Sequence, residues 1–375
     1  MTTVDVDLFA GPGGWDTGAA DIGIVPVGIE IDSDPCRTAR AFGHERQHAD
    51  VAELNPLAVV AGWADELGGL IASPPCQGFS TGGLGKSRDD SLTLLDELGF
   101  VGSVADMDRL IVELGRNLSD PRTVLVLEPL RWAMVTRPRW LAWEQVPSVL
   151  PIWEASATLL RAMGYSVRTG ILTAETFGVP QTRRRAFLVA RRIDVAAIHG
   201  TARFPSPTHA RYRHGDQLDA LELDTVRPWV SMAEALGWGG TVGFPRRADR
   251  DDVTTIDGVD YRARDLRDVT APAQVVTEKA RSWTRFTPAG RPVVEGLQPR
   301  DLTAPAHTIT GAGSAVWLDE LDDDAGLRVT VEEAAALQTF PDGYPWHGTS
   351  TSRFQQIGDA VPPLLARKIL EAIAA

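Results

Sequence analysis

The sequence predicts an α/β protein whose parallel sheet carries a ligand site at one edge, and three stretches predict this fold. Residues 4–9 alternate as a strand does, residues 10–14 are a glycine-rich turn, and residues 15–23 continue as a short helix. A second strand over residues 25–31 ends at an acidic side chain. The apolar run at residues 70–72 is stopped abruptly by two prolines. A strand, a glycine turn and a helix in this order are typical of nucleotide-binding sheets, because glycine lets the backbone come close to a ligand.

The composition is that of an ordinary globular protein. The chain has 375 residues, of which 43% are hydrophobic and 23% charged, so it can bury a large core and divide into two domains. It has no run of about 18 apolar residues and no basic-then-apolar N-terminus, so we expect no membrane partner and no secretion signal. Its two cysteines, Cys36 and Cys76, make a disulfide framework improbable. We therefore expect a protein of the cytoplasm.

The net charge of −13 at first argues against a nucleic-acid partner. However, residues 196–318 hold 15 Lys and Arg against 15 Asp and Glu, so the excess acid lies in the rest of the chain. A neutral segment within an acidic protein can present a basic face locally. The charge distribution permits nucleic-acid binding without requiring it.

The stretch around Cys76 carries the chemistry. A lone cysteine is usually a small buried residue, but Cys76 follows a strand end and two prolines in the sequence Pro74-Pro75-Cys76-Gln77. This sequence resembles the nucleophile loop of the DNA (cytosine-5) methyltransferases. By this resemblance Cys76 is the catalytic nucleophile.

The first glycine turn fits the same family. Phe9-Ala10-Gly11-Pro12-Gly13-Gly14 resembles its motif for S-adenosylmethionine. The resemblance implies that Glu30 binds the ribose, Asp50 the adenine amino group, and Phe9 the adenosine. From the pattern alone, Asp32 and Asp34 are helix-start acids and Asp50 a cap or turn residue. The cofactor-binding residues implied by the resemblance are Phe9, Gly11, Gly13, Gly14, Glu30, Ile31, Asp50, Pro75, Asp359 and Ala360.

Two further segments match family motifs beside the nucleophile. Glu144, at the end of a strand expected over residues 140–147, aligns with the Glu of Glu-Asn-Val, but Gln145 replaces the Asn. The phrase Gly-Val-Pro-Gln-x-Arg-x-Arg, which includes Gln181, is followed by a buried strand at residues 186–190. The resemblance makes Glu144, Arg183 and Arg185 catalytic, with Arg185 contacting the target base and Glu144.

The segment after the nucleophile, residues 81–104, is rich in Gly, Ser and Asp and reads as a flexible surface loop. In the family this segment closes over DNA, so Ser80, Lys86 and Arg88 are expected at phosphates, together with Gln181 at the DNA interface. A helix is expected over residues 107–118.

From about residue 194 the helical periodicity fades and Pro, Gly, Arg and Trp become frequent. A repeat links residues 267–277 with 300–310, which predicts two similar strand-and-turn units of a β-rich domain. The second unit, with Thr308, resembles a landmark of the family's target recognition domain and implies DNA contact there. Trp283, Phe286 and Trp317 are either base and phosphate contacts or core of that domain.

The C-terminal stretch matches the last two family motifs. Thr330 and Glu333 have capping-box spacing at the start of a helix. Asp359 stands where the family usually has the Asn of Gly-Asn-Ala-Val. A closing helix, residues 364–373, is expected to return to the first domain.

The resemblance implies a doubly wound, Rossmann-like S-adenosylmethionine-dependent domain at residues 1–194. It adds a smaller β-rich target recognition domain at 195–326 and a C-terminal segment, 327–375, that returns to the first domain. It implies a monomer that methylates carbon 5 of a flipped-out cytosine in duplex DNA, without a metal, and is compatible with a companion restriction endonuclease.

Three alternatives stay open on the sequence. The same core serves on RNA in one branch of the family. A relative with a decayed site would bind DNA without catalysis, which the intact Cys76, Glu144 and Arg185 oppose. Gln145 and Asp359 leave room for transfer of a group other than methyl.

Overall fold

A computed structural model places most of the chain. It describes residues 2–75, 79, 90–212, 225–237, 270–276 and 329–374, and the backbone alone of residues 86–89 and of short strands between 241 and 328. Within these ranges no helix is long and apolar enough to cross a membrane.

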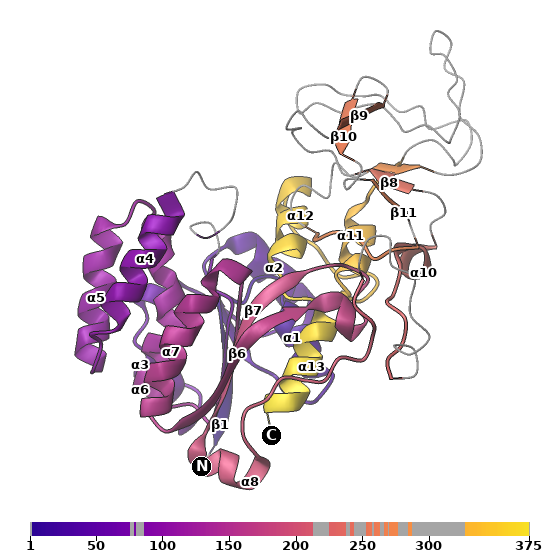
Figure 1. The fold of residues 1–375 in the computed structure, drawn as a ribbon. Coiled ribbons are helices and arrows are strands. Elements are labelled where there is room, and N and C mark those ends of the chain that lie inside the picture. Colours follow the sequence, from indigo (N-terminus) through magenta and orange to yellow (C-terminus); the bar gives the residue numbers. More distant parts are fainter. Residues whose placement is uncertain are drawn as a thin grey trace.

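A seven-stranded sheet forms the centre of the described residues (Figure 1). Across the sheet the strands are β3 (Arg46–His48), β2 (Val27–Glu30), β1 (Thr3–Leu8), β4 (Glu66–Ala72), β5 (Trp140–Gln145), β7 (Arg184–Arg192) and β6 (Tyr165–Thr173). Strand β7 runs antiparallel to β5 and β6, whereas the other neighbouring pairs are parallel. The predicted α/β fold is confirmed, and the strands from β1 to β5 end at one common edge.

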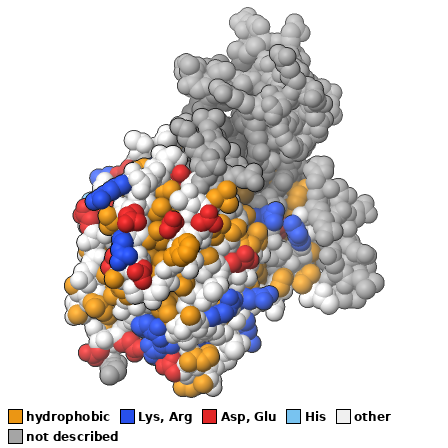
Figure 2. All heavy atoms as spheres, turned by 60° about the vertical axis from the view of Figure 1, so that its left-hand side comes forward, with side chains coloured by type: hydrophobic (Ala, Val, Ile, Leu, Met, Phe, Trp, Pro, Cys, Tyr) orange, Lys and Arg blue, Asp and Glu red, His pale blue; other side chains and the backbone are white. Residues whose placement is uncertain are grey.

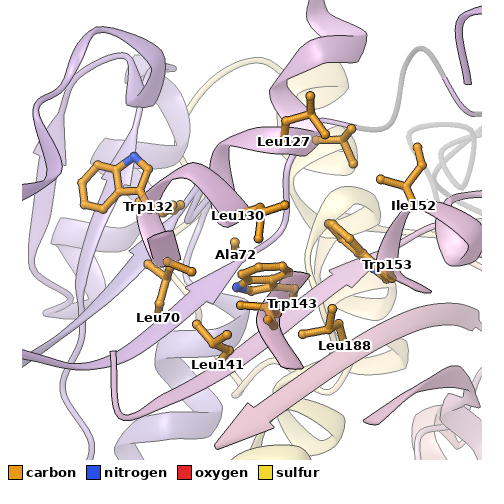
Figure 3. Close-up of a cluster of buried hydrophobic side chains, with 14 of the residues drawn as sticks. Leu70, Ala72, Leu127, Leu130, Trp132, Leu141, Trp143, Ile152, Trp153 and Leu188 are labelled. Carbon is orange, nitrogen blue, oxygen red and sulfur yellow. The ribbon is translucent and has the colours of Figure 1, made fainter. Parts of the chain in front are cut away.

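Helices cover both faces of the sheet. One face carries α3 (Pro56–Ala61), α4 (Lys86–Leu98), α5 (Val104–Asn117), α6 (Glu128–Thr136) and α7 (Leu150–Ala162). The buried cluster between them includes Trp143 of β5 and Trp153 of α7, whose ring centroids are 5.5 Å apart (Figure 3). The other face carries α1 (Gly14–Ala20) and α13 (Pro363–Ile373), which pack on each other. Two covered faces explain why β4 ends in the continuous apolar run at residues 70–72.

The prediction of a loop over residues 81–104 is wrong for most of that segment, because residues 86–98 form α4. Leu94 and Leu98 lie one helical turn apart and are fully or almost fully buried against the sheet-covering helices. The polar and glycine-rich start of the segment masked this apolar spacing. Figure 2 shows the face that includes α4 and α5, where acidic, basic and hydrophobic side chains are interspersed.

Helix α2 (Ser33–Phe42) follows β2, with Asp32 as N-cap residue and Asp34 in its first turn, as expected for helix-start acids. The expected helix at 107–118 is confirmed as α5. The 3₁₀ helices are η1 (Val51–Glu53), η2 (Pro121–Leu127), η3 (Pro147–Val149) and η4 (Ala174–Phe177). Helix α8 (Ile193–His199) follows β7, and α10 (Met232–Leu236) lies further along the chain.

The C-terminal segment packs against the elements of the sheet, where α13 contacts α1 and β5. Helix α11 (Val331–Leu337) begins at the predicted capping box, in which Thr330 and Glu333 bond each other's backbone N–H. Helix α12 (Ser350–Asp359) follows, and then α13. A Cβ on Gly18 of α1 would lie 2.4 Å from the Pro363 carbonyl oxygen, so glycine there permits the close packing of α1 and α13.

Short strands populate the region expected to be β-rich. They form a pair, β9 (Val253–Ile256) with β10 (Val259–Arg262), and a four-stranded sheet of β8 (Thr241–Gly243), β11 (Leu266–Asp268), β12 (Thr284–Phe286) and β13 (Leu327–Arg328). The first copy of the sequence repeat begins in β11, whereas the second copy lies outside the described residues. A separate recognition domain over residues 195–326 therefore stays a prediction.

Candidate active site

A cavity of about 720 Å³ opens at the edge where β1, β2, β3, β4 and β5 end. This is the edge at which open α/β sheets bind ligands. Its volume lies in the range of small-molecule sites, about 300–1,000 Å³. Nine of the ten predicted cofactor residues line it, namely Phe9, Gly11, Gly14, Glu30, Ile31, Asp50, Pro75, Asp359 and Ala360.

The glycine turn after β1 forms one wall of this cavity. Phe9, Gly11 and Gly13 have positive φ angles of 58°, 54° and 108°. Gly13 does not line the cavity; a Cβ there would lie 2.5 Å from the His44 ring. A Cβ on Gly14 would lie 2.3 Å from the Val361 carbonyl oxygen. The glycines therefore serve the backbone conformation of the turn and the close approach of neighbouring segments.

Glu30 stands at the end of β2 and is almost completely buried. Its carboxylate accepts the backbone N–H groups of Gly11 at 2.9 Å and Asp32 at 2.8 Å. Burial raises the pKa of Glu30, and these two N–H groups oppose the rise. Each oxygen has a second lone pair, so the carboxylate can still accept hydroxyl groups from a ligand in the cavity.

Asp50 is a cap residue, as its sequence pattern predicted, and it also lines the cavity. Its carboxylate accepts the Ala52 N–H at 2.9 Å as the N-cap of η1, and it lines the cavity. Capping occupies one of its oxygens, and the carboxylate retains capacity to accept an amino group.

Two side chains anchor the loop that carries Cys76. Cys76 itself lies outside the described residues, but Pro75 lines the cavity. The Gln145 amide donates to the Pro74 carbonyl at 2.6 Å, and the Ser148 hydroxyl donates to the Phe79 carbonyl at 2.9 Å. The strand β5 and the start of the following helical segment thus hold the loop on both sides of the cysteine.

Glu144 and Arg185 meet at the cavity. The Arg185 Nε and a Glu144 carboxylate oxygen are 2.9 Å apart, and both side chains are largely buried. The antiparallel course of β7 produces this pair, because Gln145 at the end of β5 is registered with Ala186 at the beginning of β7. The structure brings these two predicted catalytic residues together with Pro75.

Arg183 has a different setting. It lines the cavity but is 1% exposed, and its guanidinium donates to the Gly358 carbonyl at 2.7 Å and to the Asp359 carbonyl at 3.5 Å. It therefore fixes the end of α12. The side chain of Asp359 is exposed, and the neighbouring Arg353 donates to the Gly348 carbonyl at 3.0 Å.

Gln181 lies in the interior, although it was expected at the DNA interface. It is completely buried, donates to the Leu337 carbonyl at 3.1 Å and accepts the Val276 N–H at 2.8 Å. It also bonds the Gln338 side chain. Its amide joins three chain segments and presents no surface to DNA in this structure.

The sequence matches the family model for C-5 cytosine-specific DNA methylases over residues 3–97 and 114–375. The chain belongs to this family. It is a DNA (cytosine-5) methyltransferase, and the family together with the fold implies use of S-adenosylmethionine.

Named relatives agree with this membership, and solved structures share the fold. The chain is 25% identical to the type II methyltransferase M1.HphI of Haemophilus parahaemolyticus, over 100% of this chain and 87% of that protein. It is 28% identical to M.XorII of Xanthomonas oryzae, over 98% and 83%. Among solved structures, a DNMT2 variant of Spodoptera frugiperda matches 99% of both chains with a TM-score of 0.56 at 14% identity. The Entamoeba histolytica methyltransferase EhMeth gives a TM-score of 0.55 at 13% identity.

Several predicted residues of this methylase fall outside what the structure describes. These are Cys76, Ser80 and Thr308, and the side chains of Lys86 and Arg88. Among the described side chains, no group of three or more His, Cys, Asp or Glu could hold a metal ion.

The cavity also includes residues that the sequence reasoning missed. Among them are Asp34, Arg122, Leu125, Ser352 and Gln355. Asp34 was read as a helix-start acid, and it also accepts the Ser352 hydroxyl at 2.8 Å. Arg122 and Leu125 lie on η2, where no motif was recognised. Their only sequence signal is the start Asp120-Pro121, which marks a helix N-terminus but no ligand.

Proposed function

We propose that this methylase transfers a methyl group to carbon 5 of a cytosine in duplex DNA, with Cys76 as nucleophile. The observation that carries the proposal is the ion pair of Glu144 and Arg185 at the cavity edge, beside Pro75. Cys76 follows Pro75 directly in the sequence, and this adjacency to the paired carboxyl group and arginine supports its assignment as the nucleophile.

This arrangement suits activation of the cytosine ring. The Cys76 thiolate forms a bond to carbon 6, and the ring electrons move toward carbon 5, with charge building at ring nitrogen 3. Glu144, protonated or sharing a proton, donates a hydrogen bond to nitrogen 3 and neutralises that charge. Arg185 fixes the carboxyl group and favours the thiolate by its positive charge. After methylation, loss of the carbon-5 proton expels the Cys76 thiolate and restores the ring.

S-adenosylmethionine fits the cavity by volume and by donor set, and when bound it supplies an electrophilic methyl group on a sulfonium. Glu30 would accept the ribose hydroxyls with its remaining lone pairs, and Asp50 the adenine amino group. Phe9, Ile31 and Pro75 supply apolar surface. Ala360 and Asp359, held by Arg183, would lie at the other end of the cofactor.

The target base must leave the duplex, because carbon 6 cannot be reached inside the base stack. Unstacking costs a few kcal/mol, which contacts in the pocket must offset. We assign phosphate contacts to Ser80, Lys86 and Arg88, and base reading to residues 195–326 with Thr308. Duplex DNA is favoured over RNA by the family model and by the size of this recognition segment.

Mass analysis of nucleosides tests the proposal. Duplex DNA and transfer RNA are incubated separately with the purified protein and S-adenosylmethionine, and 5-methylcytosine is expected in the DNA alone. Methylation of transfer RNA alone would contradict the DNA assignment. A heavier cytosine product in DNA from an expressing host, absent with Asp359→Asn, would contradict methyl as the transferred group.

A further inference from the structure

Side chains from distant parts of the chain form hydrogen bonds with the backbone of the glycine turn. The Ala10 and Gly11 carbonyls each accept a hydrogen bond from the Arg46 guanidinium at 3.3 Å. The Pro12 carbonyl accepts the Tyr344 hydroxyl at 2.6 Å. The Gly13 carbonyl accepts the Thr17 hydroxyl at 2.7 Å. The carbonyl oxygens of residues 10–13 therefore all accept side-chain donors, and three of these four bonds come from outside the turn and α1.

Arg46 can act in this way because it is itself fixed. Its guanidinium forms two 2.7 Å bonds with the Asp16 carboxylate, and both side chains are buried. A Cβ on Gly28 would lie 2.1 Å from the guanidinium, so glycine on β2 makes room for it. Burial alone would lower the Arg46 pKa, but the adjacent Asp16 raises it, so the guanidinium stays charged.

The turn needs such support. Phe9 has a left-handed backbone that is unusual for a non-glycine residue, and Gly11 and Gly13 adopt positive φ on either side of Pro12. A strained segment persists only where the contacts around it hold it in place. A ligand binds more tightly to a cavity wall that already has its bound conformation.

We propose that Arg46, fixed by Asp16, and Tyr344 are positioning residues that preset the glycine turn for the cofactor. This inference rests on the proposed function. Neither Arg46 nor Tyr344 belongs to the motifs that identify the site, and neither lines the cavity. Their effect is therefore on cofactor affinity through the turn.

Two tyrosines provide a matched test. Tyr344→Phe removes the hydroxyl bonded to Pro12 and keeps the ring that packs on Phe340 and Trp346. Tyr165→Phe removes an equally buried hydroxyl, bonded to the Pro138 carbonyl at 2.7 Å, at the other edge of the sheet. Each loses the buried hydrogen bond that its hydroxyl donates to a backbone carbonyl, so their thermal stabilities should fall by similar amounts.

The readout is the Kd of S-adenosylhomocysteine measured by calorimetry. We expect Tyr344→Phe to raise it about 5- to 10-fold, as loss of one hydrogen bond does, and Tyr165→Phe to leave it unchanged. Equal Kd values for the two variants and the wild type would overturn the inference while leaving the proposed function intact. A wild type that does not bind the ligand at all would overturn both.

Arg46→Lys extends the test. Lysine keeps a charge for Asp16 but lacks the planar fork that reaches two carbonyls and a carboxylate together. A Kd raised about 10-fold or more, with the protein still folded, is expected. If this variant does not fold, the tyrosine pair decides alone.

Discussion

Asp7 on β1 is a single residue whose pKa depends on its surroundings. It is completely buried beside Asp16 and Arg46. Burial, followed by the negative charge of Asp16, raises its pKa well above the usual value of 3.8. A neutral Asp7 leaves the Asp16–Arg46 pair balanced in charge, so the support of the glycine turn contains no surplus buried carboxylate.

We predict that Asp7→Asn stabilises the protein, and more so as pH rises. A raised folded-state pKa means that the contribution of Asp7 to stability is fully present below about pH 3.8 and is lost as pH rises through the folded-state pKa. The neutral amide avoids that loss. Urea unfolding at pH 5 and pH 8 measures the difference between variant and wild type. A difference that shrinks toward pH 8 would contradict the assignment.

At the scale of elements, the sequence indicated most strands and helices because their apolar periodicity is local. It failed at α4, where a polar, glycine-rich start concealed the buried Leu94 and Leu98. It could not place Arg46 or Tyr344, because their contacts with residues 10–12 join positions up to 332 residues apart in the chain. The interior position of Gln181 was missed for the same reason, since its partners come from two other segments.

Gln145, which stands where the family has Asn, contributes a contact between elements. The longer side chain reaches the Pro74 carbonyl across the β4–β5 edge, so the loop retains a positioning contact from β5. We predict that Gln145→Ala lowers kcat about 10-fold or more, because misplacement of a nucleophile by a fraction of an ångström is costly. The Kd of S-adenosylhomocysteine should stay near that of the wild type. Unchanged kcat would show that Gln145 does not position the loop.

A shorter replacement refines that test. Asn at position 145 is one methylene shorter and should lose the bond to Pro74, so Gln145→Asn is expected to resemble Gln145→Ala in kcat. Wild-type turnover by Gln145→Asn alone would mean that the loop shifts to meet the shorter amide.

At the scale of the molecule, one edge of the sheet carries the cavity, the Glu144–Arg185 pair and the anchors of the Cys76 loop. The antiparallel β7 is essential to this arrangement, because it brings Arg185 from a distant motif to the end of β5. Sequence motifs singled out these residues as candidates. The topology explains why they meet.

Residues 196–318 should set the choice of DNA sequence and little else. They hold balanced charge, none of the predicted catalytic residues and the short strands β8 to β12. Exchange of this segment with that of a family member of known target should move the methylated sequence to that member's target. An active chimera that keeps the original target would contradict this assignment. Bisulfite sequencing of DNA from the expressing host reads the outcome.

The central claim is that Cys76 bonds to carbon 6 of cytosine while a cofactor occupies the cavity. Duplex DNA containing 5-fluorocytosine at the target should trap the wild type in the presence of S-adenosylmethionine, because the fluorine at carbon 5 cannot leave as a proton does. The account predicts a denaturation-resistant adduct that maps to Cys76 in a peptide digest and is absent from Cys76→Ser. An adduct that forms equally in Cys76→Ser, or that maps to another residue, would contradict it.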